Sequence, residues 1–118
     1  MDWMQIKTQM RWNECYVPGW DAAPENYRRA GIVKDGRSRR LGVLRMGTFK
    51  CYVGLQHVDP KQPGWGMVPE AHTRFFASMF VAGRCVALRT FPTMQGALEA
   101  LSDFVEALGE PGGTADRT

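Results

Sequence analysis

The stretch RFFASMFVAGRCVALRTFPT, Arg74 to Thr93, decides the fold. As far as Val81 its apolar and aromatic side chains occur on both sides of an extended chain, and Ala82-Gly83-Arg84 then offers a turn into a second run rich in β-favouring residues. This pattern predicts a β-hairpin. A helix over 70–82 is the alternative, because Pro69 stands where a helix could begin.

A helix is expected directly after the hairpin. Pro92 stops strand pairing, Thr93 can cap a helix, and Gly109 and Pro111 end the helical pattern. The apolar residues at helical spacing are Met94, Ala97, Leu98, Leu101, Phe104, Val105 and Leu108. Their stripe needs an apolar surface, and the hairpin is the nearest one. We therefore predict an α+β fold, in which a mainly antiparallel sheet of about four to five strands packs against a C-terminal amphipathic helix.

The middle of the chain predicts more strands. Alternation from Phe49 to Leu55 is typical of a half-buried strand, and a run ending at Met46 precedes it. Gly47-Thr48 between them fits either a bend within one long strand or a turn between two. Asp35-Gly36, which follows Ile32-Val33, predicts a tight hairpin turn.

At the N-terminus, apolar and polar residues alternate from Met4 to Trp12. We interpret this segment as a strand with one buried face, because the period is two and no N-cap signal stands out. A short amphipathic helix is the alternative. Residues 13–31 are expected to form a loop with one or two helical turns beside Pro24. Its large side chains either pack on the core or face a partner; they are Tyr16, Val17, Trp20 and Tyr27.

A second loop is predicted from His57 to Pro69, because its three prolines and two glycines suit no regular element. Trp65 in this loop is either a lid over the core or an anchor for a partner. The opening stretch is apolar on both faces, and one helix covers only one of them. The other face needs a cover, from the chain itself or from a second copy, and we therefore expect a homodimer.

The 118 residues, 44% of them hydrophobic, suit one domain over 1–109 with a flexible tail at 110–118. The longest uncharged run in the core region, Phe75 to Gly83, is far shorter than the roughly 20 residues of a membrane span. No signal peptide is evident. Three separated cysteines indicate a reducing cytoplasm, and Cys51 and Cys85 are interpreted as small apolar residues buried in strands.

Catalytic and metal-binding patterns do not occur in the sequence. The two histidines, His57 and His72, belong to no recognised motif, and the nearest pairings are His57 with Asp59 or either histidine with a cysteine brought near by the fold. We interpret His57 as a solvated loop histidine. No ligand spacing suggests a metal, and we expect neither a cofactor nor enzymatic activity.

Charge is distributed unevenly along the chain. The net charge is only +3, but basic residues concentrate between Arg28 and Lys50, and the C-terminal helix is acidic. The basic residues are Arg28, Arg29, Lys34, Arg37, Arg39, Arg40, Arg45 and Lys50. We expect one charged side of each sign, which favours oriented association with a charged partner.

Two binding functions follow. The first is a small regulatory or inhibitory protein that binds a protein partner stoichiometrically, with Trp20, Trp65 and Phe76 as anchors and Arg39 and Arg40 steering the encounter. The second is nucleic-acid binding through the basic segment, with Tyr27, Tyr52 or Phe49 stacking on bases. The sequence favours the first, because a net charge of +3 is low for a nucleic-acid module.

Overall fold

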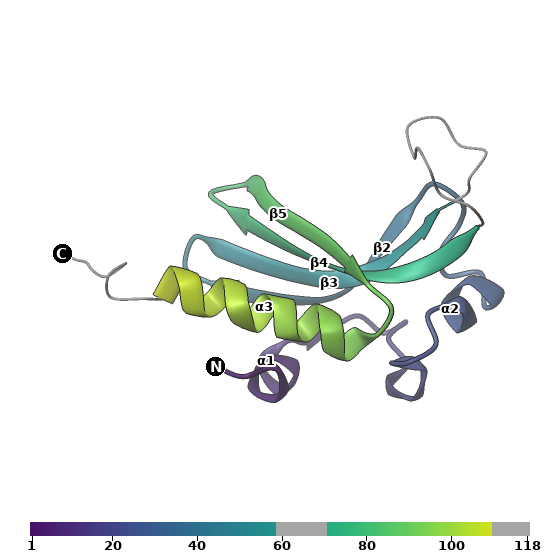
Figure 1. Cartoon of the computed structure of the whole chain (residues 1–118), viewed down its shortest axis with the longest axis horizontal. Coiled ribbons are helices and arrows are strands. Elements are labelled where there is room, and N and C mark those ends of the chain that lie inside the picture. Colours follow the sequence, from purple (N-terminus) through teal and green to yellow (C-terminus); the bar gives the residue numbers. More distant parts are fainter. Residues whose placement is uncertain (59–70, 110–118) are drawn as a thin grey trace.

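A computed structural model describes residues 1–58 and 71–109 of the chain (Figure 1). Five strands form one antiparallel sheet in the order β1-β2-β3-β4-β5, so each strand pairs with its neighbours along the chain. The strands are β1 Arg11–Trp12, β2 Ser38–Met46, β3 Phe49–Val58, β4 His72–Val81 and β5 Arg84–Phe91. The helices are α1 Trp3–Gln9, α2 Glu25–Arg29 and α3 Met94–Gly109, and η1 Pro18–Trp20 is a 3-10 turn. The predicted α+β class and the C-terminal helix are confirmed.

The hairpin in the opening stretch is confirmed as β4 and β5. Ala82 and Gly83 make its turn with φ angles of 50° and 82°, in the region that glycine tolerates best. Gly47-Thr48 forms a turn between two strands and not a bend within one, because β2 ends at Met46 and β3 begins at Phe49.

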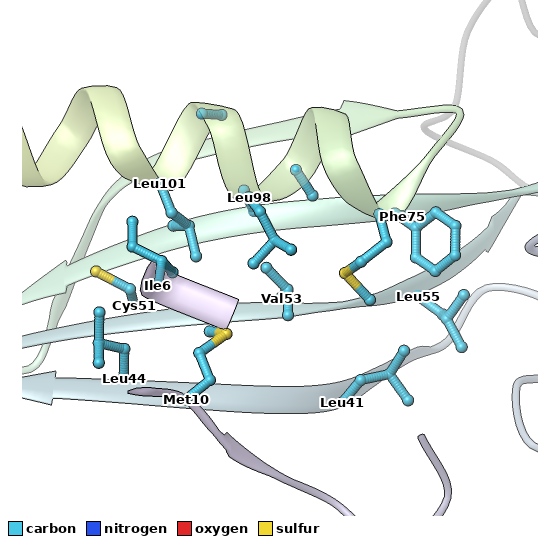
Figure 2. Close-up of a cluster of buried hydrophobic side chains, with 14 of the residues drawn as sticks. Ile6, Met10, Leu41, Leu44, Cys51, Val53, Leu55, Phe75, Leu98 and Leu101 are labelled. Atoms are coloured by element: carbon cyan, nitrogen blue, oxygen red, sulfur yellow. The ribbon is translucent and has the colours of Figure 1, made fainter. Parts of the chain in front are cut away.

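One face of the sheet forms the core, and α3 and α1 lie side by side on that face (Figures 1 and 2). Leu98 and Leu101 of α3 are fully buried there against the middle strands, as the helical spacing predicted. Ile6 and Met10 from the α1 region complete the layer. The strands contribute Leu44, Cys51, Val53, Leu55, Phe75, Ala77 and Met79.

The predicted strand from Met4 to Trp12 is wrong over most of its length, because residues 3–9 form α1 and only Arg11–Trp12 pair with β2. The helix begins with a capping box, a signal that the alternating pattern obscures. The Asp2 carboxylate accepts from the Gln5 amide at 2.9 Å, and the Gln5 side chain accepts from the Asp2 amide at 2.8 Å. The alternation of apolar and polar residues therefore does not mark a strand here, because the capping box stabilises a helix.

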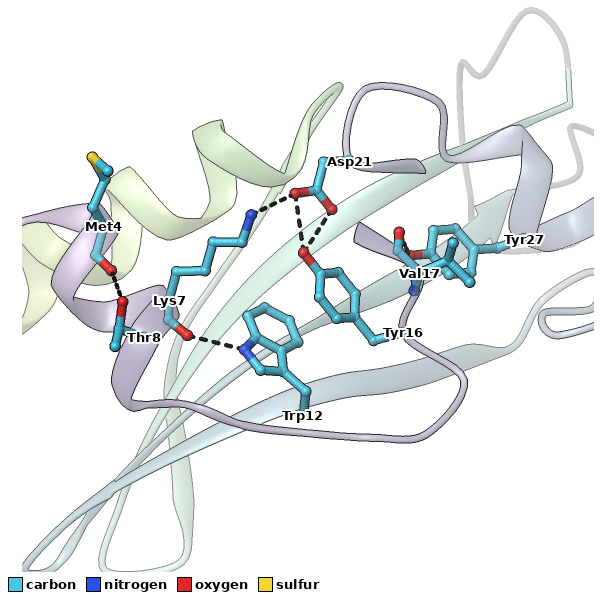
Figure 3. A network of polar contacts seen from close by, with 8 residues as sticks. All are labelled: Met4, Lys7, Thr8, Trp12, Tyr16, Val17, Asp21 and Tyr27. Atoms are coloured by element: carbon cyan, nitrogen blue, oxygen red, sulfur yellow. Dashed lines mark hydrogen bonds and ion pairs between the residues drawn. The ribbon is translucent and has the colours of Figure 1, made fainter. Parts of the chain in front are cut away.

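The long segment after β1 packs on the molecule instead of projecting from it (Figure 3). Asp21 is its centre: the Lys7 ammonium lies 2.8 Å from this carboxylate, and the Tyr16 hydroxyl donates to it at 2.8 Å. The Trp12 ring stacks on Tyr16 with centroids 4.0 Å apart, and its indole N–H donates to the Lys7 carbonyl. These bonds connect α1 to the loop. Tyr27 lies in α2, the helical turn predicted beside Pro24, and is fully buried.

Two further expectations need correction. Asp35-Gly36 is a turn, with Gly36 at a φ of 70°, but it joins α2 to β2 and no strand precedes it, so the hairpin predicted there is wrong. Cys51 is buried as expected, and burial raises the pKa of its thiol to about 11. Cys85 is exposed, because it faces away from the helix layer. The predicted loop 59–69 and the predicted tail 110–118 lie outside the described residues.

Candidate functional site

The face of the sheet opposite α1 and α3 has no described helix packed on it (Figure 1). We call it the open face. Residues opposite each other in neighbouring strands point to the same side, so the register assigns its members. They form four rows across the strands: Arg45, Lys50, Phe80 and Cys85; Arg11, Val43, Tyr52, Ser78 and Leu88; Arg40, Gly54, Phe76 and Thr90; Ser38, Gln56 and Arg74.

An irregularity in β2 brings Arg40 onto this face. The pairing of β2 with β3 shifts between Arg40 and Gly42, so that Leu41 is an extra residue. Leu41 is fully buried in the core, while Arg40 and Val43, three positions apart, both reach the open face. A regular strand would have sent one of them to the opposite side.

The open face carries positive charge, and the strands that form it contribute no acid. Strands β1 to β5 contain no aspartate or glutamate. The register places five basic side chains on this face: Arg11, Arg40, Arg45, Lys50 and Arg74. The acids Glu99, Asp103 and Glu106 belong to α3, which covers the other face and contains no basic residue. The three acids of α3 therefore lie on the opposite side of the sheet from these five cations, on a side that also carries Arg39, Arg84 and Arg89.

Aromatic rings lie among these cations. The Arg40 guanidinium carbon is 3.8 Å from the centroid of the Tyr52 ring and 5.6 Å from that of Phe80. Tyr52 and Phe80 meet edge to face, with centroids 5.5 Å apart. Stacking on a ring holds a guanidinium plane in a defined orientation while its edges stay able to donate hydrogen bonds.

Phe76 lies flat on the sheet because its neighbour across the strands is glycine. A Cβ atom built on Gly54 would come within 2.6 Å of the Phe76 ring and closer still to the Arg39 carbonyl oxygen. The ring therefore occupies the space above Gly54 and is only 6% exposed. Phe76 acts as part of the floor of the open face.

Arg40 lines two of the hollows that open on this face. The first hollow, of about 220 Å³, is lined by Arg11, Trp12, Asn13, Arg40, Leu41, Gly42, Val43 and Tyr52. The second hollow, of about 170 Å³, is lined by Ser38, Arg40, Gln56, Phe76, Ser78, Phe80, Cys85 and Leu88. Arg40 is the one side chain that the two hollows share.

The structure places two of the three predicted protein anchors, Trp20 and Phe76, in less accessible positions than the sequence suggested. Trp20 is half-buried and packs edge-on against Tyr27, with ring centroids 5.0 Å apart. Phe76 is buried in the floor of the open face. Trp65 lies outside the described residues.

The structure places the residues of the basic segment in different parts of the molecule. Arg40, Arg45 and Lys50 reach the open face, whereas Arg39 is opposite Leu55 and points to the other side. Arg28 and Arg29 lie in α2, and Lys34 and Arg37 lie in the turn that follows it. Of the predicted stacking residues, Tyr52 lies on the open face, while Tyr27 is buried and Phe49 packs on the core side.

Three members of the open face were not predicted as binding residues from the sequence. Arg11 comes from β1, within the segment whose helix was missed, and Arg74 and Phe80 come from the opening hairpin. The pairing between strands is what places each of them on the open face. Alternation in β4 separates Arg74 and Phe80 from the core-facing residues, but the partner strand is needed to place them beside Lys50 and Gln56.

A buried polar cluster lies at the α2 end of the sheet. His57 is the second-to-last residue of β3 and is 1% exposed, so its interpretation as a solvated loop histidine is wrong. Its Nδ1 lies 2.7 Å from the Thr73 hydroxyl, and its Nε2 lies 3.1 Å from the Arg28 Nε and 3.0 Å from an Asp35 carboxylate oxygen. Glu25 accepts from the Thr73 amide at 2.5 Å.

With Nε2 accepting from Arg28, the His57 proton lies on Nδ1, which donates to the Thr73 hydroxyl oxygen, and Thr73 donates to the Glu25 carboxylate. Burial alone raises the pKa of Glu25, but the bonds from Thr73 and the electrostatic interactions with His57 and Arg28 lower it below its ordinary value. The cluster fastens α2 to the sheet, and its histidine is too buried to meet a substrate.

Among residues 1–58 and 71–109, no helix is long and apolar enough to cross a membrane, and no group of three or more His, Cys, Asp or Glu side chains could hold a metal ion. In the described part of the chain, the open face combines cations with aromatic rings and two hollows, and it is the candidate site. No family model, curated protein or solved structure matches this chain, so its function is inferred from this face alone.

Proposed function

We propose that this is a non-enzymatic nucleic-acid-binding protein that uses the open face of its sheet. One observation supports the proposal above all: five cations and the rings of Tyr52 and Phe80 share a face whose five strands contain no acid. The low net charge is a weak objection, because the acids that lower it belong largely to segments away from this face, α3 among them.

The chemistry of the face suits a phosphate polymer. Lysine and arginine side chains neutralise phosphates and release counterions, which supplies most sequence-independent affinity. The half-buried rings of Tyr52 and Phe80 between them offer stacking surfaces for bases, a combination common to proteins that bind nucleic acids on sheet faces. Arg40 has a guanidinium held flat on Tyr52 and lines both hollows, so it is central to the proposed surface.

Paired charge-removing variants test the proposal. Arg45→Gln with Lys50→Gln removes two cations that face each other on the open face, and Arg84→Gln with Arg89→Gln removes two from the opposite side of β5. Binding of labelled mixed-sequence DNA and RNA is measured by fluorescence anisotropy between about 50 mM and about 200 mM salt. The first pair should weaken binding and reduce the salt slope by about one for each phosphate that is no longer neutralised. Absence of binding at low salt, or equal weakening by the two pairs, contradicts the proposal.

The second candidate is the regulatory or inhibitory protein that the sequence favoured, acting on a protein partner and forming a homodimer in the reducing cytoplasm. A specific observation favours it: Val86 and Leu88 on the edge strand β5 are 58% and 56% exposed. They replace Trp20 and Phe76 as the anchors. Sedimentation of the wild type and of Leu88→Ser tests the dimer, which should weaken in the variant. A monomer of the wild type at tens of micromolar (about 50 µM) removes homodimerisation from this candidate.

A further inference from the structure

We propose that the first hollow binds an unpaired nucleobase, so that the ligand of the open face is single-stranded nucleic acid. This inference rests on the proposed function and specifies it. It starts from the position of the hollow, which lies where the short strand β1 meets β2 and contains two of the face's cations, Arg11 and Arg40.

The dimensions of the hollow fit one ring system. Its volume of about 220 Å³ is below the roughly 300 Å³ at which pockets for larger organic ligands begin. The hollow is open to solvent, so a base can enter it while the attached sugar and phosphate remain outside. This geometry suits a ligand that is a polymer with one flat group inserted.

The lining supplies what a base requires. Val43 gives an apolar floor, and the Tyr52 ring with the Arg40 guanidinium stacked on it at 3.8 Å gives flat surfaces on one side. Asn13 contributes a carboxamide, fixed because its oxygen accepts from the Cys15 amide at 3.0 Å. Arg11 is exposed at the edge, where the phosphate of an inserted nucleotide would lie.

A duplex fits this face poorly. The five strands span roughly 19 Å, from four spacings of about 4.8 Å, whereas the major groove of B-DNA is about 12 Å wide. The helix that could enter a groove, α3, is acidic and lies on the other side of the sheet. A single strand has no such restriction, because its bases are already unpaired.

The test compares three labelled ligands of about 12 nucleotides: a mixed-sequence DNA strand, a strand of the same length with stable abasic sugars at every position, and a duplex. The wild type should bind the base-bearing strand at least about fivefold more tightly than the abasic strand, since one stacked base contributes about 1 kcal/mol or more. It should also bind that strand more tightly than the duplex. Equal affinities for the base-bearing and abasic strands overturn the base site while leaving the nucleic-acid proposal intact; failure to bind any ligand overturns both.

A matched pair of variants assigns the base to this hollow. Val43→Met places a longer apolar side chain in the lining of this hollow, and Val86→Met makes the same substitution at an exposed position of β5 that lines neither hollow. Val43→Met should lose the preference for the base-bearing strand and keep the affinity for the abasic one, whereas Val86→Met should keep both. Retention of the full preference by Val43→Met, with unchanged melting temperatures, contradicts the assignment.

Discussion

At the scale of single residues, Gly54 shows why the open face is shaped as it is. Any side chain there meets the Arg39 carbonyl oxygen and the Phe76 ring, and the carbonyl belongs to backbone that cannot rotate away. Glycine thus allows Phe76 to lie against the sheet and line the second hollow. The sequence showed an interior glycine in a strand, but the atoms that require it come from two neighbouring strands.

Gly54→Ala should therefore destabilise the protein by about 1–3 kcal/mol, because the added methyl group overpacks the sheet. Gly19→Ala is the control, since a Cβ at Gly19 has no atom within 4 Å, and it should change stability by less than about 0.5 kcal/mol. Chemical denaturation measures both. Similar free energies of unfolding for the two variants would show that the Phe76 ring and strand β2 move aside easily.

Glu25 links stability to pH. Its folded pKa is lowered from an ordinary value of 4.5, so its charged form stabilises the fold above that value, and the contribution is lost as pH falls through the folded pKa. The free-energy difference between wild type and Glu25→Gln should stay constant from about pH 7 to about pH 5.5 and shrink below about pH 4.5. Glu99→Gln on the exposed side of α3 is the control. A Glu25→Gln difference that stays constant down to about pH 3 contradicts this linkage.

At the scale of elements, α3 packs on the sheet through the stripe of apolar residues that recur at helical spacing in its sequence. Leu101→Asp places a charge at a fully buried position and should cost several kcal/mol, about 3 or more, or prevent folding. Gln95→Asp puts the same charge on an exposed position of the helix and should change stability little. Thermal melting compares them. A Leu101→Asp protein that melts like Gln95→Asp would place Leu101 outside the core.

Some of these elements could be predicted from the sequence and others could not. The hairpin of β4 and β5 and the helix α3 follow from patterns long enough to outweigh local alternatives. The segment of α1 is short, and its strand-like alternation competed with a capping box made by Asp2 and Gln5, which decides for the helix. The open face was only partly predictable: Arg40, Arg45 and Lys50 come from the basic segment, but strand register is needed to add the cations of β1 and β4.

At the scale of the whole molecule, the acids of α3 lie on the opposite side of the sheet from the five cations of the open face, and the α3 side also carries Arg39, Arg84 and Arg89. The acidic helix α3 and the helix α1 cover one side, and the other side presents the cations of the open face (Figure 1). Such a field orients an approaching polyanion toward the open face and away from α3. The two sides can be tested separately by mutation, because adjacent residues in one strand point to opposite sides of the sheet.

Arg39 and Arg40 provide that experiment. They are adjacent in β2 and both exposed, but only Arg40 belongs to the open face and lines its hollows. The measurement is the affinity of Arg39→Gln and Arg40→Gln for a mixed-sequence single strand, by fluorescence anisotropy over the salt series. We predict that Arg40→Gln weakens binding by about 1–3 kcal/mol, roughly fivefold or more, and that Arg39→Gln stays close to wild type. Equal weakening by the two variants, or a larger effect of Arg39→Gln, would contradict the assignment of the open face as the binding surface.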